Sequence, residues 1–210
     1  MINLPLYAGL SSMEIGLPKG VSLSPAANRA HGTIAFYCSS ITQGACASRP
    51  GSSYAHIVCR ALDADCMNLG FSSAALGEQA VAQYIASREI SAFVLDYDHN
   101  HTLEGLAQTH YAFYQTVRDA HPDIPILMLT QPVFSAEATE DQKQRQAIIR
   151  QSYERAVASG DQHVYYLCGE NFWDSSMPDL YTVDMLHPND LGHYHMAQAV
   201  LDVLKPALDR

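Results

Sequence analysis

The sequence has few basic residues and no cluster of them. Its 210 residues include 12 Lys and Arg against 22 Asp and Glu, which gives a formal net charge of −10. Nucleic acids and anionic membrane surfaces are bound mainly through clustered positive charge. The composition therefore argues against both as partners, and it favours, weakly, an uncharged small molecule as the ligand.

Long hydrophobic segments are absent as well. Residues 1–20 have no basic start and no long apolar run, and an acidic residue and prolines interrupt them. We therefore expect neither a signal peptide nor a membrane-spanning segment, and a cytoplasmic location is the default expectation.

The cysteines suit neither a disulfide framework nor a zinc site. They number five, which is odd, and no two of them form a Cys-x-x-Cys pair. We expect them to be free, buried thiols in a reducing compartment.

What the sequence does contain is a regular alternation of strand and helix patterns behind an N-terminal arm. Residues 1–30 are rich in Gly, Pro, Ser and Ala and predict an extended arm, whose alternating piece at 13–17 suits one short strand. The predicted strands cover residues 33–38, 65–69, 90–95, 124–130 and 163–167. The predicted helices cover residues 54–62, 76–88, 103–120, 140–159 and 190–208. This alternation predicts a three-layer α/β/α sandwich with a five-stranded parallel sheet, formed by one domain over residues 31–210.

Residues that could carry chemistry follow the first two predicted strands. In a parallel α/β sheet the site forms beyond the carboxyl ends of the strands. Ser40 follows the first strand and could present its hydroxyl to a cleft, although the glycines of a Gly-x-Ser-x-Gly nucleophile turn are missing. The loop at 68–74 is rich in small residues, whose backbone N–H groups can approach a developing oxyanion.

The loop after the third predicted strand allows three interpretations. Asp96, Asp98 and Asn100 imitate the start of an EF-hand, but position six is His101 and position twelve is an alanine, which excludes calcium in that mode. His99 and His101 could ligate a metal ion, but no third ligand is placed with them. Asn100 could donate its side-chain amide to an oxyanion.

The most distinctive stretch lies near the end of the chain. Asp184 precedes His187 by three residues, on a loop that ends at Pro188. At this spacing the carboxylate can hold one imidazole nitrogen. That arrangement is the orienting half of a catalytic triad.

Taken together, these segments resemble the SGNH (GDSL-type) hydrolase family over residues 31–205. The most specific pieces are the Ser-Ser-Ile-Thr-Gln-Gly stretch at 39–44 and the Asp-x-x-His-Pro-Asn stretch at 184–189. The resemblance implies a flavodoxin-like SGNH fold.

The resemblance also implies a role for each candidate residue. Ser40 would be the nucleophile, His187 the general base and Asp184 the residue that orients His187. The oxyanion hole would consist of the backbone N–H groups of Ser40 and Ser73 and the side-chain amide of Asn100. No metal and no organic cofactor is implied.

The sequence departs from the family pattern at two positions, and a segment before the hydrolase domain resembles one found in some relatives. Cys38 and Ser73 stand where the family usually has glycine. The segment Leu4-Pro5-Leu6-Tyr7 resembles the one that, in some relatives, joins a preceding β-sandwich domain to the hydrolase domain.

The expected function is therefore that of a serine esterase or acylhydrolase acting on a small acyl ester, such as an O-acetylated sugar. Two alternatives remain open at this point. The Asp96 and Asp98 pair suits a haloacid-dehalogenase-like phosphatase with magnesium, although the motif comes late in the chain and no glycine follows its second Asp. The departures at Cys38 and Ser73 suit a binding module on an inactive hydrolase scaffold.

Overall fold

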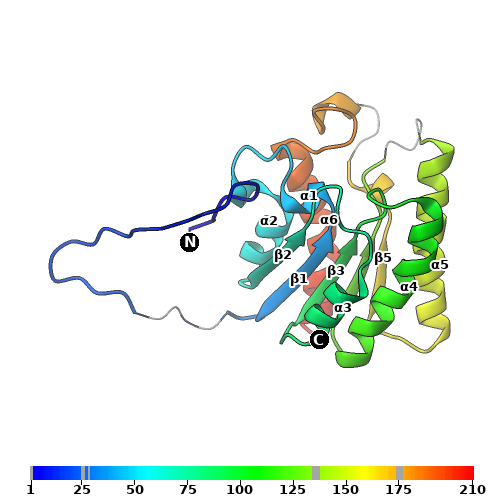
Figure 1. The fold of residues 1–210 in the computed structure, drawn as a ribbon, viewed down its shortest axis with the longest axis horizontal. Helices are drawn as coiled ribbons and strands as arrows, with labels where there is room; N and C mark the ends of the chain where they lie inside the picture. Colours follow the sequence, from blue (N-terminus) through cyan, green and yellow to red (C-terminus); the bar gives the residue numbers. More distant parts are fainter. Residues whose placement is uncertain (1, 25–26, 28, 134–137, 174–176) are drawn as a thin grey trace.

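One sheet with helices on both faces makes up the body of the protein, and a long arm extends from one side of it (Figure 1). The computed structural model describes residues 2–24, 27, 29–133, 138–173 and 177–210. The strands are β1 (Thr33–Cys38), β2 (Asp65–Gly70), β3 (Ala92–Asp96), β4 (Ile126–Leu129) and β5 (Val164–Leu167). The helices are α1 (Ser40–Gln43), α2 (Tyr54–Ala61), α3 (Gln79–Ala86), α4 (Leu103–Ala120), α5 (Glu140–Ala158) and α6 (Asp190–Leu208). The 3₁₀ turns are η1 (Pro50–Ser52), η3 (Gly169–Asn171) and η4 (Pro178–Leu180).

The five strands are all parallel and lie in the order β2-β1-β3-β4-β5. This is the flavodoxin-like order, so the predicted fold class is confirmed. The order reverses at β1, and ligands of such sheets bind where the loops on either side of the reversal diverge. Cys38 pairs with both Gly70 and Asp96, so the loops after β1, β2 and β3 start at one level.

Successive side chains of each strand enter different cores. Ile34 and Phe36 of β1 pack with α2 and α6 on one face. Ala35 and Tyr37 pack with α3, α4 and α5 on the other face. Because both faces are covered, the strands are nearly continuous apolar runs, as expected for a parallel sheet.

Two predicted helices, 103–120 and 190–208, have the bounds that the structure gives them, whereas the helix predicted from residue 76 begins only at Gln79. The reason lies at Gly77, which has a φ of 76° and therefore cannot continue a right-handed helix. Its N–H donates to the hydroxyl of Tyr37 at 2.9 Å, which holds the chain in this turn.

The described part of the arm, residues 2–24 and 27, contains neither helix nor strand. The short strand predicted at 13–17 is therefore wrong, because no neighbouring strand lies there to pair with it. Leu10, Met13, Ile15 and Leu17 are all exposed. The division into an arm (1–30) and a hydrolase domain (31–210) stays a prediction.

All five cysteines are free thiols, but not all are buried. Cys38 and Cys59 are buried as predicted, whereas Cys46 is exposed because its loop lies at the surface beside the sheet's carboxyl edge. None of the described helices is both long and apolar enough to cross a lipid bilayer.

Candidate active site

Ser40 begins a four-residue helix directly beyond the end of β1. Ser39 caps this helix: its hydroxyl accepts a hydrogen bond from the N–H of Ile41 at 3.3 Å. The N–H of Ser39 itself donates to the carbonyl of Asp96 at 3.1 Å, which ties the turn to the neighbouring strand. The first residues of a helix have no intrahelical acceptor for their N–H groups. Within the described part of the chain, the N–H of Ser40 has no other acceptor either.

Helix α1 lies against the end of β2, and this contact requires a glycine. A Cβ atom on Gly70 would lie 2.2 Å from the backbone nitrogen of Gln43 and 2.6 Å from its Cα. Backbone atoms cannot rotate away as a side chain can. The amide of Asn68 also donates to the carbonyl of Thr42 at 2.7 Å, so β2 supports the helix that presents Ser40.

The structure brings Ser40, His187 and Asp184 into one chain of hydrogen bonds. Ser40 Oγ lies 3.0 Å from His187 Nε2, and His187 Nδ1 lies 2.7 Å from Asp184 Oδ2. An ionised carboxylate can only accept, so the imidazole proton lies on Nδ1 and Nε2 is free to accept from the serine hydroxyl. Ser40 and His187 are 147 positions apart in sequence, so this is a tertiary arrangement that no local pattern contains.

A tight loop sets the geometry of the acidic half of this arrangement. Thr182 and Pro188 form an antiparallel bridge, and Met185 takes a left-handed conformation with a φ of 66°. Asp184 Oδ1 accepts hydrogen bonds from the N–H groups of Leu186 at 3.1 Å and His187 at 2.6 Å. These bonds hold the Asp184 carboxylate in the orientation in which its other oxygen contacts the imidazole.

The electrostatics of Asp184 suit an ionised partner for His187. Burial alone would raise the pKa of Asp184, but the hydrogen bonds from the His187 side chain and from the backbone N–H groups of His187 and Leu186 bring it below its ordinary value. The carboxylate therefore stays charged well into the acid range, although its side chain is 49% exposed.

The loops after β2 and β3 meet near the expected oxyanion donors. Asn100 Nδ2 donates to the carbonyl of Phe71 at 3.0 Å, which links the third loop to the second. Ser73 has a φ of 56°, and within the described residues its N–H has no acceptor. An unpaired N–H at Ser40, another at Ser73 and the second amide proton of Asn100 are thus available as donors.

Gln43 connects three parts of this edge of the sheet. Its Nε2 donates to the carbonyl of Leu6 in the arm at 3.0 Å, and its Oε1 accepts from the N–H of Ser72 at 2.8 Å. The hydroxyl of Tyr7 in the arm donates to the carbonyl of Ser40 at 3.2 Å. The sequence patterns predicted neither the contacts of Gln43 nor that of Tyr7. The position of Gln43 in the 39–44 stretch could have indicated its involvement, whereas nothing in the residues around Tyr7 does.

Asp96 is fully buried below the turn that presents Ser40. Its Oδ2 is 3.5 Å from the hydroxyl of Thr42, which shares a 2.6 Å hydrogen bond with Tyr54. Burial and the neighbouring Asp98 carboxylate raise the pKa of Asp96 to about 7. A nucleophile must reach its substrate, so this position does not suit the phosphatase mechanism considered for Asp96 and Asp98.

Among the described residues, Asp96, Asp98 and His99 have ligand atoms within 4.8 Å of one another, the spacing of a metal site. The carboxylate of Asp98 is already shared between His99 Nδ1, at 3.2 Å, and the N–H of Gln131, at 3.1 Å. We therefore regard it as a structural link between the loops after β3 and β4. His101, the other histidine considered as a metal ligand, does not belong to this group and packs against Gly105 instead.

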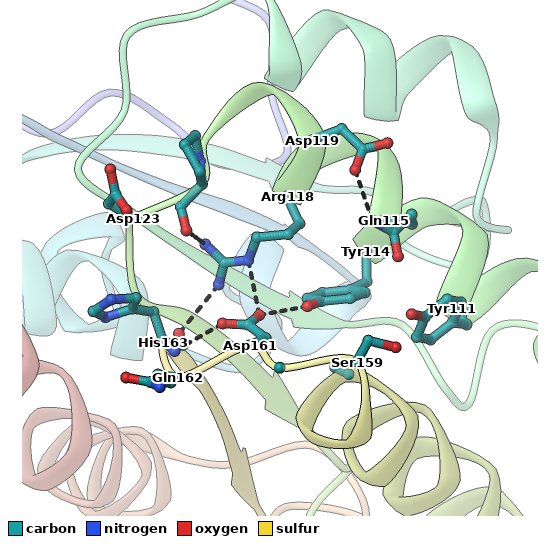
Figure 2. A pocket seen from close by; sticks show the side chains of 13 residues that line it. Tyr111, Tyr114, Gln115, Arg118, Asp119, Asp123, Ser159, Asp161, Gln162 and His163 are labelled. Carbon is teal, nitrogen blue, oxygen red and sulfur yellow. Dashed lines mark hydrogen bonds and ion pairs between the residues drawn. The ribbon is translucent and has the colours of Figure 1, made fainter.

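A cavity of about 520 Å³ lies at the far end of the sheet, between the ends of α4 and α5 (Figure 2). Arg118 crosses it and donates to Asp161 through Nε at 2.8 Å. The other guanidinium donors reach backbone carbonyls, those of His121, Pro122, Ile124 and His163. Because these bonds occupy the guanidinium, it holds this corner of the fold together rather than a ligand. The hydrogen-bonded residues Ser40, His187 and Asp184 lie at the opposite edge, where the strands end.

Comparison with known proteins agrees with this geometry. A model of the GDSL-like Lipase/Acylhydrolase family matches residues 31–205. The crystal structure of a protein from Bacteroides ovatus ATCC 8483, described as a GDSL-like lipase, is 30% identical with a TM-score of 0.84. The match covers 99% of this chain, and this chain spans only 62% of the length of that protein.

More distant structures share the fold. A family two carbohydrate esterase from Clostridium thermocellum, solved with cellohexaose, is 17% identical with a TM-score of 0.70, and the match covers 89% of this chain and 67% of that one. A two-domain esterase active on acetylated mannans is 22% identical with a TM-score of 0.64, covering 86% of this chain and 51% of that one. The comparison with curated proteins gave no match.

The family match takes in the stretches that carry Ser40, Asn100, Asp184 and His187, and the sheet order is the one that the resemblance implied. The chain belongs to the GDSL-like lipase/acylhydrolase family.

Proposed function

We propose that this protein is a serine esterase that cleaves small acyl esters through an acyl-enzyme on Ser40. The observation that carries the proposal is the pair of contacts made by His187, 3.0 Å from Ser40 Oγ and 2.7 Å from Asp184 Oδ2. A nucleophile, its base and a group that orients the base are the parts that acyl transfer to serine requires.

In the first step Ser40 Oγ attacks the ester carbonyl carbon while its proton passes to His187 Nε2. The carbonyl oxygen becomes an oxyanion, which the N–H groups of Ser40 and Ser73 and the amide of Asn100 stabilise. Asp184 holds the imidazole and stabilises the imidazolium that forms.

Collapse of the tetrahedral intermediate breaks the bond to the alcohol, which leaves with the proton from His187. Water then repeats the sequence on the acyl-enzyme: His187 takes a proton from water, and the hydroxide attacks the Ser40 ester. The carboxylic acid leaves as Ser40 Oγ recovers its proton.

An acyl ester of a sugar is the substrate class that we propose. The support comes from two proteins that share the fold, one named as a carbohydrate esterase and one as active on acetylated mannans. The chain is short of basic residues, which agrees with an uncharged substrate.

The test is a fluorophosphonate labelling experiment combined with an ester series. We expect Ser40 to be the labelled residue in the digest, and we expect Ser40→Ala to abolish cleavage of p-nitrophenyl acetate. Ser87→Ala, which changes an exposed serine at the end of α3, should behave as wild type. Labelling of Ser39 with Ser40 unmodified would refute the assignment, and a protein that is inert to both probes would support a binding module instead.

A further inference from the structure

The first residues of the arm are fastened to the nucleophile helix rather than free. The carbonyl of Leu6 accepts from Gln43 Nε2 at 3.0 Å, and the hydroxyl of Tyr7 donates to the carbonyl of Ser40 at 3.2 Å. Leu6 also fills the space above Gly44, where a Cβ atom would lie 2.3 Å from Leu6 Cδ1. The arm therefore reaches the residue that carries the nucleophile, through hydrogen bonds between residues 33 and 37 positions apart in sequence.

A cavity of about 290 Å³ lies between this part of the arm and the loop that follows α1. One wall is arm residues 5–8, and the other is Gly44 with residues 47–50. The second wall is tied to the start of α6: the N–H of Ser48 donates to Asp190 at 2.8 Å, and Asp190 follows His187 by three residues. The cavity is thus attached to Ser40 on one side and to the His187 segment on the other.

The lining of the cavity is mostly apolar; its one charged side chain is that of Arg49, and it carries no carboxylate. Pro5, Leu6, Ala8 and Ala47 contribute aliphatic surface, and the hydroxyl of Ser48 is already bound to Asp190. Tyr7 is 55% exposed while its hydroxyl is held, so a face of its ring is open for stacking. About 290 Å³ lies at the lower end of the range for ligand pockets and suits one ring rather than a long chain.

We propose that this cavity is the subsite for the leaving alcohol of the ester, that it accepts a ring-sized alcohol, and that Tyr7 is the residue that determines this preference. The inference rests on the proposed esterase function and specifies its substrate. The alcohol side is indicated because His187 protonates the leaving alcohol, and the loop that forms the far wall is fastened to the His187 segment.

Two acetates of secondary alcohols, which have similar intrinsic reactivity, test the proposal: cyclohexyl acetate, with a ring alcohol, and isopropyl acetate, without one. We expect wild type to prefer the cyclohexyl ester in kcat/KM. Tyr7→Ala should reduce that preference by about tenfold, mainly through KM, the scale of a lost contact in an apolar pocket. Tyr7→Phe keeps the ring and should keep the preference. Ala8→Trp fills the cavity from an exposed arm position and should reduce the preference without altering Tyr7.

Tyr84→Ala is the matched control, because Tyr84 is a similarly exposed tyrosine that stacks with Arg88 on α3. The proposal is overturned if wild type shows no preference for the ring ester. It is also overturned if Tyr7→Ala and Ala8→Trp both leave the preference intact, or if they lower cleavage of both esters equally. Cleavage that depends on Ser40, with no effect of the cavity variants, rejects the subsite alone. If Ser40 is not labelled by the fluorophosphonate and is not needed for ester cleavage, both the esterase function and the subsite are rejected.

Discussion

Ser73 has a backbone conformation that glycine adopts at less cost, with a φ of 56°. It stands where the family usually has glycine, so the side chain has changed while the glycine-like backbone has been kept. A backbone donor at Ser73 therefore survives the substitution. The sequence alone identified the position but could not indicate which conformation the loop would take.

Returning this residue to glycine should relieve strain. The left-handed region costs a residue with a Cβ atom about 1–2 kcal/mol, and the greater freedom of glycine in the unfolded chain offsets about 0.4–1 kcal/mol of that. We expect Ser73→Gly to raise the free energy of unfolding by up to about 1 kcal/mol and to keep esterase activity. Chemical denaturation measures this, with Ser72→Gly, where φ is not positive, as the destabilising control. A less stable Ser73→Gly variant would contradict the strain argument.

Asn100 could be an oxyanion donor or only a structural link between two loops, and its substitution distinguishes these roles. Its hydrogen bond to an oxyanion strengthens as charge develops, so Asn100→Ala should lower kcat by about 10²–10³ with little change in KM. The bond to the Phe71 carbonyl is also lost in this variant, and thermal unfolding will register that part separately. Full turnover by Asn100→Ala would remove it from the oxyanion hole.

At the scale of elements, the start of a helix was predictable where a neighbouring residue caps it, and was not where it depends on a distant contact. Thr102 caps α4 and Asn189 caps α6 through their own side chains, so both starts can be read from adjacent residues. The start of α3 depends on the bond between Gly77 and Tyr37, which are 40 positions apart. The four-residue helix α1 is too short to show a period, so the sequence indicated only a loop beyond Cys38.

The same distinction applies to the candidate site. Asp184 and His187 lie on one short loop, and their spacing predicted the contact that the structure contains. The contacts of Tyr7 with Ser40 and of Gln43 with Leu6 join segments more than 30 residues apart. Only the fold brings such segments together, so the hydrophobic pattern of the sequence does not predict their contacts.

The contact between α1 and β2 gives a prediction at this scale. Gly70→Ala places a Cβ atom 2.2 Å from the backbone nitrogen of Gln43, so α1 must move as a unit and carry Ser40 with it. Displacement of about 1 Å at a reacting group lowers turnover by roughly 10², and we expect kcat to fall by about that factor. Gly16→Ala, in the arm with no atom within 4 Å, is the control and should be silent. If Gly70→Ala keeps wild-type kcat, α1 is not held rigidly by β2.

For the molecule as a whole, each face of the sheet buries a titratable group that resists its charged form, Asp96 on one face and His110 on the other. Asp96 lies with the α2 and α6 face, beside Tyr54 and Thr42, and burial and Asp98 raise its pKa to about 7. His110 of α4 lies on the other face, stacked on Tyr97, and burial lowers its pKa to about 4 against a smaller opposing effect of Asp98. In the part of the chain that the structure describes, neither nitrogen of His110 has a hydrogen-bond partner.

These two groups should give stability opposite dependences on pH. The folded state holds the Asp96 proton that the unfolded chain loses near pH ~4, so this group makes stability fall as pH rises from about 4 to 7. His110 stays neutral in the fold while the unfolded chain takes up a proton below pH ~6.5, so stability falls as pH drops from about 6.5 to 4. Each effect reaches at most about 1.4 kcal/mol per pH unit, and over the shared window they oppose one another. His99, beside Asp98, has a raised pKa: burial alone would lower it, but its hydrogen bond and attraction to Asp98 outweigh that, which adds to the fall with rising pH.

Single substitutions should therefore tilt the pH profile of stability in opposite directions. Asp96→Asn removes the decrease in the free energy of unfolding that Asp96 causes as pH rises. The stability of this variant relative to wild type should therefore grow between pH 4.5 and 7.5. His110→Phe keeps the stacked ring and removes two unpaired nitrogens, so its advantage over wild type should be largest at pH 4.5 and smaller at pH 6.5. Urea unfolding of the three proteins at four pH values measures the free energies directly. If either variant gives a curve parallel to that of wild type, the group it replaces does not change its protonation on unfolding, and the neutral buried form assigned to that group is wrong.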